Sequence, residues 1–297
     1  MELRQVKGHT WVLEGFEYIP IYRIDQHKCI FLDTGLAQER QDIIEAIEQY
    51  ALEPVGVLCS HAHVDHGGNN RFLQETYGIP VAMTAAEAGM CVSLLTLKCY
   101  FLLLTPETVE REAAGLVQHP DVIVPPENGK FSFVGVDFEI IHTPGHSAGH
   151  IVIVTPDKVC YVGDALLSVE MMGSKLPYSL SHKQAAVSRQ RLRDISCEKL
   201  IMAHRGVAEG SELPSLIDQN DALLAQRAAE IQSLVVRPMT ASEISRAVCN
   251  YYELFTKKTS RSLRFERNIR FFIEYLVDEG RLFMSTEAGV TKYSQLQ

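Results

Sequence analysis

Apolar and polar residues follow two different periods along the first part of the chain, and each change of period marks a predicted element. Runs rich in β-branched and aromatic residues at 10–16, 18–24 and 29–33 predict three strands. Between 37 and 52 the apolar residues recur at helical spacing, which predicts an amphipathic helix. The apolar run 54–60 predicts a buried strand. This alternation of strand and helix indicates an α/β fold.

The same alternation continues to about residue 206. Further strands are predicted at 78–83, 129–133, 136–143, 151–154, 159–162 and 199–203, the second and third of these joined as a hairpin. Helices are predicted at 71–77, 86–116 and 181–195. We expect the apolar segment 86–116 to pack in the core or at a dimer contact. An apolar cover over a substrate pocket is the alternative.

Beyond residue 206 the pattern changes to helices followed by a hairpin. The predicted elements are a long helix at 214–235, helices at 240–255 and 263–278, and short strands at 281–284 and 290–293. Two helices and a hairpin in this order are typical of a winged-helix unit. We therefore expect a catalytic domain at 1–210, a connecting helix at 211–236 and a winged-helix-like domain at 237–297.

Composition narrows the class of protein. With 46% hydrophobic and 22% charged residues, the chain is typical of a folded enzyme and not of a disordered protein. Seven cysteines without a CxxC pair predict reduced thiols, and the longest apolar run, 92–104, contains Lys98 and is too short to span a bilayer. The start of the chain has no apolar signal core. We therefore expect a cytoplasmic protein that makes no membrane contact.

The chemistry of the sequence is concentrated at the end of the predicted strand 54–60. Four residues with metal-binding side chains, His61, His63, Asp65 and His66, lie within six positions. If the strand conformation persists, His61 and His63 point the same way and can share one ion. Asp65 and His66 follow where the chain turns, at Gly67-Gly68, and can face a second ion. A histidine-rich surface loop or a capping cluster is the alternative.

Three further candidate ligands also follow predicted strands. His146 lies in the loop 142–150, Asp164 ends the strand 159–162 after a glycine, and His204 follows the strand 199–203. In α/β folds the ends of strands are where binding sites gather. The seven residues therefore predict a metal site assembled from distant parts of the chain.

These motifs resemble the metallo-β-lactamase superfamily, particularly its glyoxalase II-like branch. The matching motifs are HxHxDH at 61–66, HTPGHSxGH at 142–150, GD at 163–164 and the late His204. The resemblance implies a four-layer αβ/βα sandwich with a dinuclear site at one edge. It also implies which residues hold each ion: His61, His63 and His146 the first, Asp65, His66 and His204 the second, with Asp164 bridging both. The C-terminal part resembles the branch with small winged-helix domains, which includes acyl-thioester hydrolases and RNA-cleaving enzymes.

The other histidines of the second motif have different expected roles. We expect His142 and His150 to donate hydrogen bonds that orient Asp164 or His146, or to approach the substrate. A buried histidine with satisfied hydrogen bonds is the equal alternative. The presence of His66 and Asp164 argues against β-lactam hydrolysis, and the helical region that supplies glutathione-binding residues in glyoxalase II has no matching segment here.

The predicted function is a hydrolase that uses two divalent metal ions and a hydroxide bridging them to cleave an ester-like bond, in first place a thioester or another acyl ester. Asp65 is the predicted catalytic residue because it can orient the hydroxide. Zinc is the expected metal, and iron and manganese are the alternatives. The alternatives are a phosphodiesterase or ribonuclease and an iron oxygenase with a single metal ion.

The distribution of charge along the chain indicates which kinds of substrate and partner to expect. Residues 237–297 carry a net charge of +3 and the remainder −12, so the acidic chain has a basic end. The spacing of Arg261, Arg264, Arg267 and Arg270 predicts one exposed helix edge. We expect a small, anionic substrate. For the basic helix, packing or a homodimer contact is favoured over nucleic acid.

Overall fold

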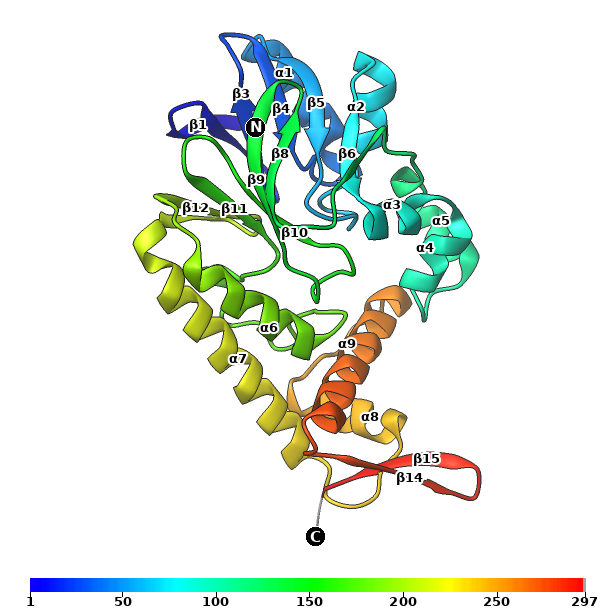
Figure 1. The fold of residues 1–297 in the computed structure, drawn as a ribbon. Coiled ribbons are helices and arrows are strands. Elements are labelled where there is room, and N and C mark those ends of the chain that lie inside the picture. Colours follow the sequence, from blue (N-terminus) through cyan, green and yellow to red (C-terminus); the bar gives the residue numbers. More distant parts are fainter. Residues whose placement is uncertain (296–297) are drawn as a thin grey trace.

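Two β-sheets face each other and carry helices on their outer surfaces, as Figure 1 shows for residues 1–295, the part of the chain described by this computed structural model. Seven strands form the first sheet in the order β1-β2-β3-β4-β5-β6-β7, and six form the second in the order β13-β12-β11-β10-β9-β8. The predicted four-layer αβ/βα sandwich is confirmed.

The first sheet is antiparallel in its first half and parallel in its second half, from β4 onward. Its strands are β1 (Glu2–Lys7), β2 (Thr10–Glu14), β3 (Tyr18–Arg23), β4 (Lys28–Leu32), β5 (Glu53–Leu58), β6 (Val81–Thr84) and β7 (Val122–Val124). The sequence did not predict β1 and β7, which are the two edge strands. No residue of β1 is fully buried and β7 has only three residues, so neither shows a clear apolar period.

The second sheet is antiparallel except where β11 and β12 run parallel. Its strands are β8 (Gly129–Phe133), β9 (Val136–His142), β10 (Ile151–Val154), β11 (Val159–Gly163), β12 (Lys199–Met202) and β13 (Gly206–Glu209). The predicted hairpin is confirmed: Val134 and Gly135 both have positive φ, as a tight turn between twisted strands requires. The edge strand β13 was not predicted, because the sequence shows a turn at its start.

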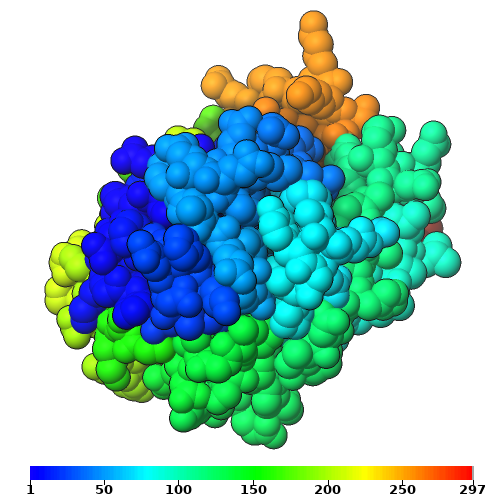
Figure 2. Space-filling model, turned by 90° about the horizontal axis from the view of Figure 1, so that it is seen from above, coloured from blue at the N-terminus to red at the C-terminus, as the bar shows by residue number. Residues whose placement is uncertain are grey.

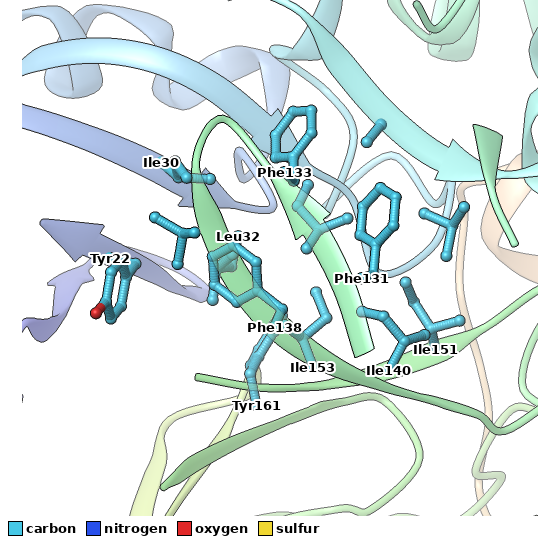
Figure 3. Packing of buried hydrophobic residues seen from close by; sticks show 14 of the residues in the cluster. Tyr22, Ile30, Leu32, Phe131, Phe133, Phe138, Ile140, Ile151, Ile153 and Tyr161 are labelled. Carbon is cyan, nitrogen blue, oxygen red and sulfur yellow. The ribbon is translucent and has the colours of Figure 1, made fainter. Parts of the chain in front are cut away.

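The main core lies between the sheets. Figure 3 shows aromatic and branched side chains from both sheets meeting there, among them Ile30 and Leu32 of β4, Phe138 of β9 and Tyr161 of β11. Phe138 and Tyr161 are each only 1% exposed. Removing one such side chain from water stabilises the fold by about 1.5–3 kcal/mol. The strands that precede the candidate ligands are therefore anchored in this core.

Helices cover the outer face of each sheet. α1 (Arg40–Gln49), α2 (Asn70–Tyr77) and α3 (Ala85–Cys91) place Ile43, Leu73 and Ala88 against the first sheet. α6 (His182–Arg191) and α7 (Leu213–Ser233) lie along the second sheet, where Leu216 and Ile217 of α7 are buried. Short 3-10 turns complete several of these helices: Ala37–Glu39, Ala114–Leu116, Val169–Met171, Leu192–Asp194 and Gly210–Glu212.

The segment predicted as helical over 86–116 is three short helices and not one. They are α3, α4 (Leu94–Tyr100) and α5 (Pro106–Ala113). α4 starts at Ser93, whose hydroxyl accepts a hydrogen bond from the Thr96 amide, and α5 starts at Thr105 with a proline in its first turn. These polar N-cap residues divide a segment that its apolar composition predicts as one continuous helix. The helices share a small core with Ala62, which lies in the loop 61–66 after β5.

The C-terminal part consists of the end of α7, then α8 (Ala241–Tyr251), α9 (Thr259–Asp278), β14 (Phe283–Glu287) and β15 (Val290–Ser294). A single bridge pairs Met239 with Tyr293, which adds a third extended segment to the hairpin. The predicted capping box at Thr240 and Glu243 is confirmed. Among residues 1–295, no helix combines the length and the apolar character needed to cross a membrane.

α7 connects the two parts of the molecule by packing in both. Leu213, Leu216 and Ile217 in its first half are buried against the second sheet, whereas Leu224 and Ile231 in its second half are buried with α8 and α9. Figure 1 shows α9 lying between α6 and α4. Figure 2, seen from above, shows the N-terminal half of the chain in blue and cyan with orange C-terminal residues emerging beyond it. The C-terminal part therefore lies against the sandwich.

Candidate metal centre

The seven predicted ligands come together at one edge of the sandwich. β4 and β5 are parallel in the first sheet, and β9, β11 and β12 run in one direction in the second, so the carboxyl ends of these strands meet. The loops that follow them carry all seven residues: His61, His63, Asp65, His66, His146, Asp164 and His204. The strand-end reasoning therefore places every candidate correctly in space, while metal binding itself stays a prediction.

One group of ligand atoms consists of three imidazoles and a carboxylate. His63 Nδ1 lies 2.9 Å from His61 Nε2 and 3.0 Å from His146 Nε2. Asp164 Oδ2 lies 3.1 Å from His146 Nε2. The four ligand atoms all lie within 4.8 Å of one another, which is compact enough to surround one ion.

A second group lies on the other side of Asp164. The ligand atoms of Asp65, His66 and His204 are also within 4.8 Å of one another. Asp164 Oδ1 lies 3.5 Å from His66 Nε2 and 3.3 Å from His204 Nε2. Asp164 thus lies between the groups, and these two sets match the division that the resemblance implies. A third compact set, Asp33, His61 and His66, overlaps both.

Two glycines allow the loops to reach this geometry. At Gly68 a Cβ atom would lie 2.6 Å from the Gly35 and Val64 carbonyl oxygens, so no other residue fits without moving backbone. Gly145 has φ +131°, and a Cβ there would lie 2.2 Å from the amide nitrogen of Ala185. Asn69 precedes α2, but its side chain makes no capping bond to that helix and instead donates to the Thr34 and Leu36 carbonyls.

A buried aspartate that the sequence reasoning did not single out organises the ligands from behind. Asp33 follows β4 and adopts φ +69°, a backbone conformation that is costly for residues other than glycine. Its carboxylate accepts hydrogen bonds from Ser60 N at 2.6 Å, Ser60 Oγ at 2.5 Å and Tyr161 OH at 2.6 Å, and lies 2.8 Å from His66 Nδ1. The ring proton of His66 is thereby held at Nδ1.

These hydrogen bonds test whether the residues fit metal ions. Because Ser60 Oγ donates to Asp33, it can only accept from His61 Nδ1, 3.0 Å away, and the Nε2 lone pair of His61 is left facing the cluster. Among residues 1–295, His66 Nε2 and Asp164 Oδ1 are buried without a hydrogen-bond partner. Lone pairs that converge in this way, on atoms otherwise unsatisfied, fit cations.

The electrostatics differ between the two groups. Burial, followed by the neighbouring imidazoles, holds the pKa of His61 and His63 well below the usual value, which favours the neutral form that metal binding requires. Burial also opposes a charge on His204, but Asp164 and Glu17 outweigh it and raise the pKa of His204 to about 10. The second group therefore favours positive charge, whether on the ring or on a metal ion.

Two buried glutamates support the loops. Glu87 of α3 accepts hydrogen bonds from Ala62 N, Ser147 Oγ and Gly149 N, so one carboxylate joins the first histidine loop to the second. Glu17 Oε1 lies 2.7 Å from His204 Nδ1 and orients that ring. Burial raises the pKa of both carboxyls.

His150 and His142 have different environments. His150 is buried, its Nδ1 lies 2.7 Å from Thr143 Oγ1, and its Nε2 accepts a hydrogen bond from the Asp164 amide. It therefore orients Asp164 as expected, although by accepting and not by donating. The expectation for His142 is wrong, because its Nε2 lies 2.8 Å from the Pro125 carbonyl oxygen, away from the ligands.

A cleft of about 230 Å³ opens onto the ligands. Its walls are formed by His63, Val64, Asp65, Tyr100, Phe101, His146, Asp164, Tyr178, His204, Arg264 and Arg267. Tyr100 and Phe101 come from the end of α4, which supports the alternative that this segment covers a pocket, while Leu97 of the same helix packs in the core. The two arginines come from α9, so the predicted exposed edge of that helix partly faces the cleft.

Some supporting residues could have been found from the sequence and others could not. Asp33 is the last residue of a predicted strand and directly follows β4 in the structure, which is the same signal that identified Asp164. Glu17, Glu87 and Tyr178 carry no such signal, since each is a lone residue in a turn, helix or loop. Only the folded chain shows their role.

Comparison with known proteins supports this site. The sequence profile described as Metallo-beta-lactamase superfamily matches residues 15–204. A hydroxyacylglutathione hydrolase of Rhizobium meliloti is 24% identical over 198 residues, which are 66% of each chain. The hydroxyacylglutathione hydrolase GloC of Haemophilus influenzae is 25% identical over 185 residues, 61% of this chain and 82% of that protein. This chain thus spans just under two thirds of the Rhizobium relative.

Solved structures show a similar fold over almost the whole chain. A metallo-beta-lactamase family protein from Thermus thermophilus has a TM-score of 0.72 at 19% identity, covering 99% of this chain and 98% of that one. A beta-lactamase domain protein from Burkholderia ambifaria has a TM-score of 0.73 at 17% identity, covering 99% and 94%. At these identities the likeness shows the fold, the C-terminal helices included. The profile match over most of the chain shows more: this protein belongs to the metallo-β-lactamase superfamily, as its histidine and aspartate motifs predicted.

Proposed function

We propose that this protein is a hydrolase that binds two divalent metal ions and cleaves a thioester or another acyl ester. The superfamily and the names of the relatives indicate a metal-dependent hydrolase. The observation that carries the proposal is the position of Asp164, whose carboxylate lies between two groups of ligand atoms and within 3.1–3.5 Å of His146, His66 and His204. A site for a single ion would not need the second group, Asp65, His66 and His204.

The chain's own residues have distinct roles in this reaction. His61, His63 and His146 would hold the first ion, Asp65, His66 and His204 the second, and Asp164 both. Ions bound there lower the pKa of water and polarise the acyl carbonyl. Asp65 lines the cleft, so its carboxylate can orient the attacking water and accept its proton. The acyl carbon gains an oxygen from water, and the thiolate leaves and takes up a proton.

Metal content gives the first test of this proposal. We expect about two ions per chain by elemental analysis after loading with zinc, iron or manganese. His146→Ala should reduce this content and abolish hydrolysis. His142→Ala is the matched control, because it removes a histidine of the same motif whose ring lies against the Pro125 carbonyl oxygen, away from the candidate ligands. One ion per chain in the fully loaded wild type would contradict the dinuclear site and favour a mononuclear oxygenase.

A substrate panel gives the second test. Thioesters, lactones and bis-p-nitrophenyl phosphate should be compared at defined metal loading. We expect the highest kcat/KM for thioesters. A clear preference for the phosphodiester would reject acyl transfer to water as the main reaction and favour a phosphodiesterase.

A further inference from the structure

Helix α9 contributes one wall of the cleft, and its orientation there is fixed. Leu263 in its first turns packs against the small core formed by α4 and α5. One turn further on, Asn268 Nδ2 donates a hydrogen bond to the Leu176 carbonyl in the loop that carries Tyr178. These contacts on two sides set the rotation of the helix. Arg267, between them, is therefore directed into the cleft.

Arg267 is separated from the ligands by a single aromatic ring. Its Cζ atom lies 4.3 Å from the centroid of the Tyr178 ring. That ring lies in turn 5.2 Å from the His146 ring and 5.4 Å from the His63 ring, centroid to centroid. A guanidinium that stacks on an aromatic face keeps its hydrogen-bonding edge free. Because Nε and Nη2 of Arg267 contact Asn268 Oδ1, it is the Nη1–Nη2 edge that presents a positive, bidentate donor next to the place where the acyl group would react.

The charge of Arg267 is not compensated within the chain. Among residues 1–295, no carboxylate pairs with it, and its Nε and Nη2 reach only the neutral Asn268 Oδ1, at 3.3 and 3.2 Å. Arg189 and Arg227, two other arginines with limited exposure, each pair with an aspartate or glutamate at 2.7–2.8 Å. Burial, and then the neighbouring Arg264, lower the pKa of Arg267. A half-buried cation in this setting costs stability unless an anion joins it.

We infer that Arg267 binds a carboxylate or phosphate group of the substrate and so selects acyl esters that carry a negative charge near the scissile bond. This inference rests on the proposed function. Arg264 lies at the mouth of the same cleft, half-exposed, with Glu112 Oε2 3.7 Å away, and adds to the positive field there. Because Arg267 belongs to α9, the C-terminal part of the chain determines specificity while the sandwich supplies the metal site.

The inference is tested with pairs of thioesters in which one member carries a carboxylate and the other is neutral. S-succinyl-N-acetylcysteamine and S-butanoyl-N-acetylcysteamine place the charge on the acyl side. The S-acetyl derivatives of 3-mercaptopropionate and of N-acetylcysteamine place it on the thiol side. We expect the wild type to prefer the charged member of at least one pair. Charged hydrogen bonds contribute about 1.5–3 kcal/mol, so Arg267→Met should reduce that preference about 10- to 150-fold.

Two further variants separate charge recognition from packing. Arg267→Lys keeps the charge but not the bidentate fork, so we expect a partial return of the preference. Arg261→Met is the control on the same helix, since Arg261 is exposed and does not line the cleft. A wild type that does not prefer either charged thioester, or an Arg267→Met variant that keeps the wild-type preference, would overturn the inference.

A binding measurement keeps the inference separate from the proposed hydrolysis. Calorimetry with a thioether that cannot be hydrolysed, S-(3-carboxypropyl)-N-acetylcysteamine, should show at least tenfold tighter binding than its S-butyl counterpart. Arg267→Met should remove this difference at unchanged metal content. Charge-selective binding without any thioester turnover would reject the proposed reaction and retain the anion site. Equal binding of both thioethers by the wild type would reject the anion site.

Discussion

Replacing Asp33 with asparagine should weaken metal binding although Asp33 is not itself a predicted ligand. The carboxylate accepts from Ser60 N and Oγ, from His66 Nδ1 and from Tyr161 OH, all at 2.5–2.8 Å. Oδ2 receives three of these contacts, from Ser60 Oγ, His66 Nδ1 and Tyr161 OH, and Oδ1 receives the fourth, from Ser60 N. An asparagine that keeps its oxygen at the Oδ2 position would turn its amide nitrogen toward Ser60 N. The ring of His66 would then face a neutral oxygen in place of a carboxylate, which holds its proton at Nδ1 less strongly.

The magnitude follows from the hydrogen bonds that are lost or weakened. A hydrogen bond to a charged group contributes about 1.5–3 kcal/mol, so losing the one from Ser60 N and removing the charge from the acceptor of the other three should lower the free energy of unfolding by about 3 kcal/mol. Loss of a residue that orients a metal-bound histidine typically reduces metal affinity about 10- to 100-fold. We expect the second ion, on the His66 side, to be affected more than the first.

The assay combines urea unfolding in chelator with a calorimetric metal titration. Asp157→Asn is the control, because Asp157 also accepts from a main-chain amide and a hydroxyl, His9 N at 2.7 Å and Thr10 Oγ1 at 2.9 Å, but lies away from the ligands. It should lower stability without changing metal affinity. An Asp33→Asn protein that binds both ions as tightly as the wild type would refute the reasoning.

Three other predictions concern the loops, the metal and one helix. Glu87→Gln should reduce kcat/KM at least tenfold at saturating metal, because the two histidine loops lose a shared acceptor; unchanged kinetics would contradict this role. Chelation should lower Tm, and zinc should restore it, since the folded state alone presents the assembled ligands. The pKa of Glu243 is lowered to about 2, chiefly by the hydrogen bond from the Thr240 amide, so its stabilising effect is complete above its unfolded pKa, near 4.5, and is lost as pH falls toward 2. Thermal unfolding monitored by circular dichroism should therefore show Glu243→Gln less stable than the wild type at neutral pH but equal to it near pH 2.

The sequence predicted well where the candidate ligands lie, because their spacing reflects local geometry. His61 and His63 need only an extended backbone to face one ion, and Asp164 and His204 need only follow a strand. The alternation of periods also predicted the sheets, apart from edge strands such as β1, whose residues are partly exposed and show no clear pattern.

Features that depend on packing between distant segments could not be predicted. The roles of Glu17 and Glu87 arise only when the loops fold over them. The spacing of Arg264 and Arg267 defines a face of α9, but charge alone does not show which way that face turns. The contacts of Leu263 and Asn268 turn it partly toward the cleft.

The dual packing of α7 has a consequence for how this architecture can be recombined. The C-terminal part cannot be exchanged for another at a flexible linker. The single helix α7, of 21 residues, packs in both the hydrophobic cluster of the second sheet and that of the C-terminal part. A chimaera joined after α7 would expose Leu224 and Ile231 to water, because their partners in α8 and α9 would be missing. A chimaera joined before α7 would expose the outer face of the second sheet. We therefore expect a chimaera to fold only if it retains α7 and changes the residues in one half of that helix.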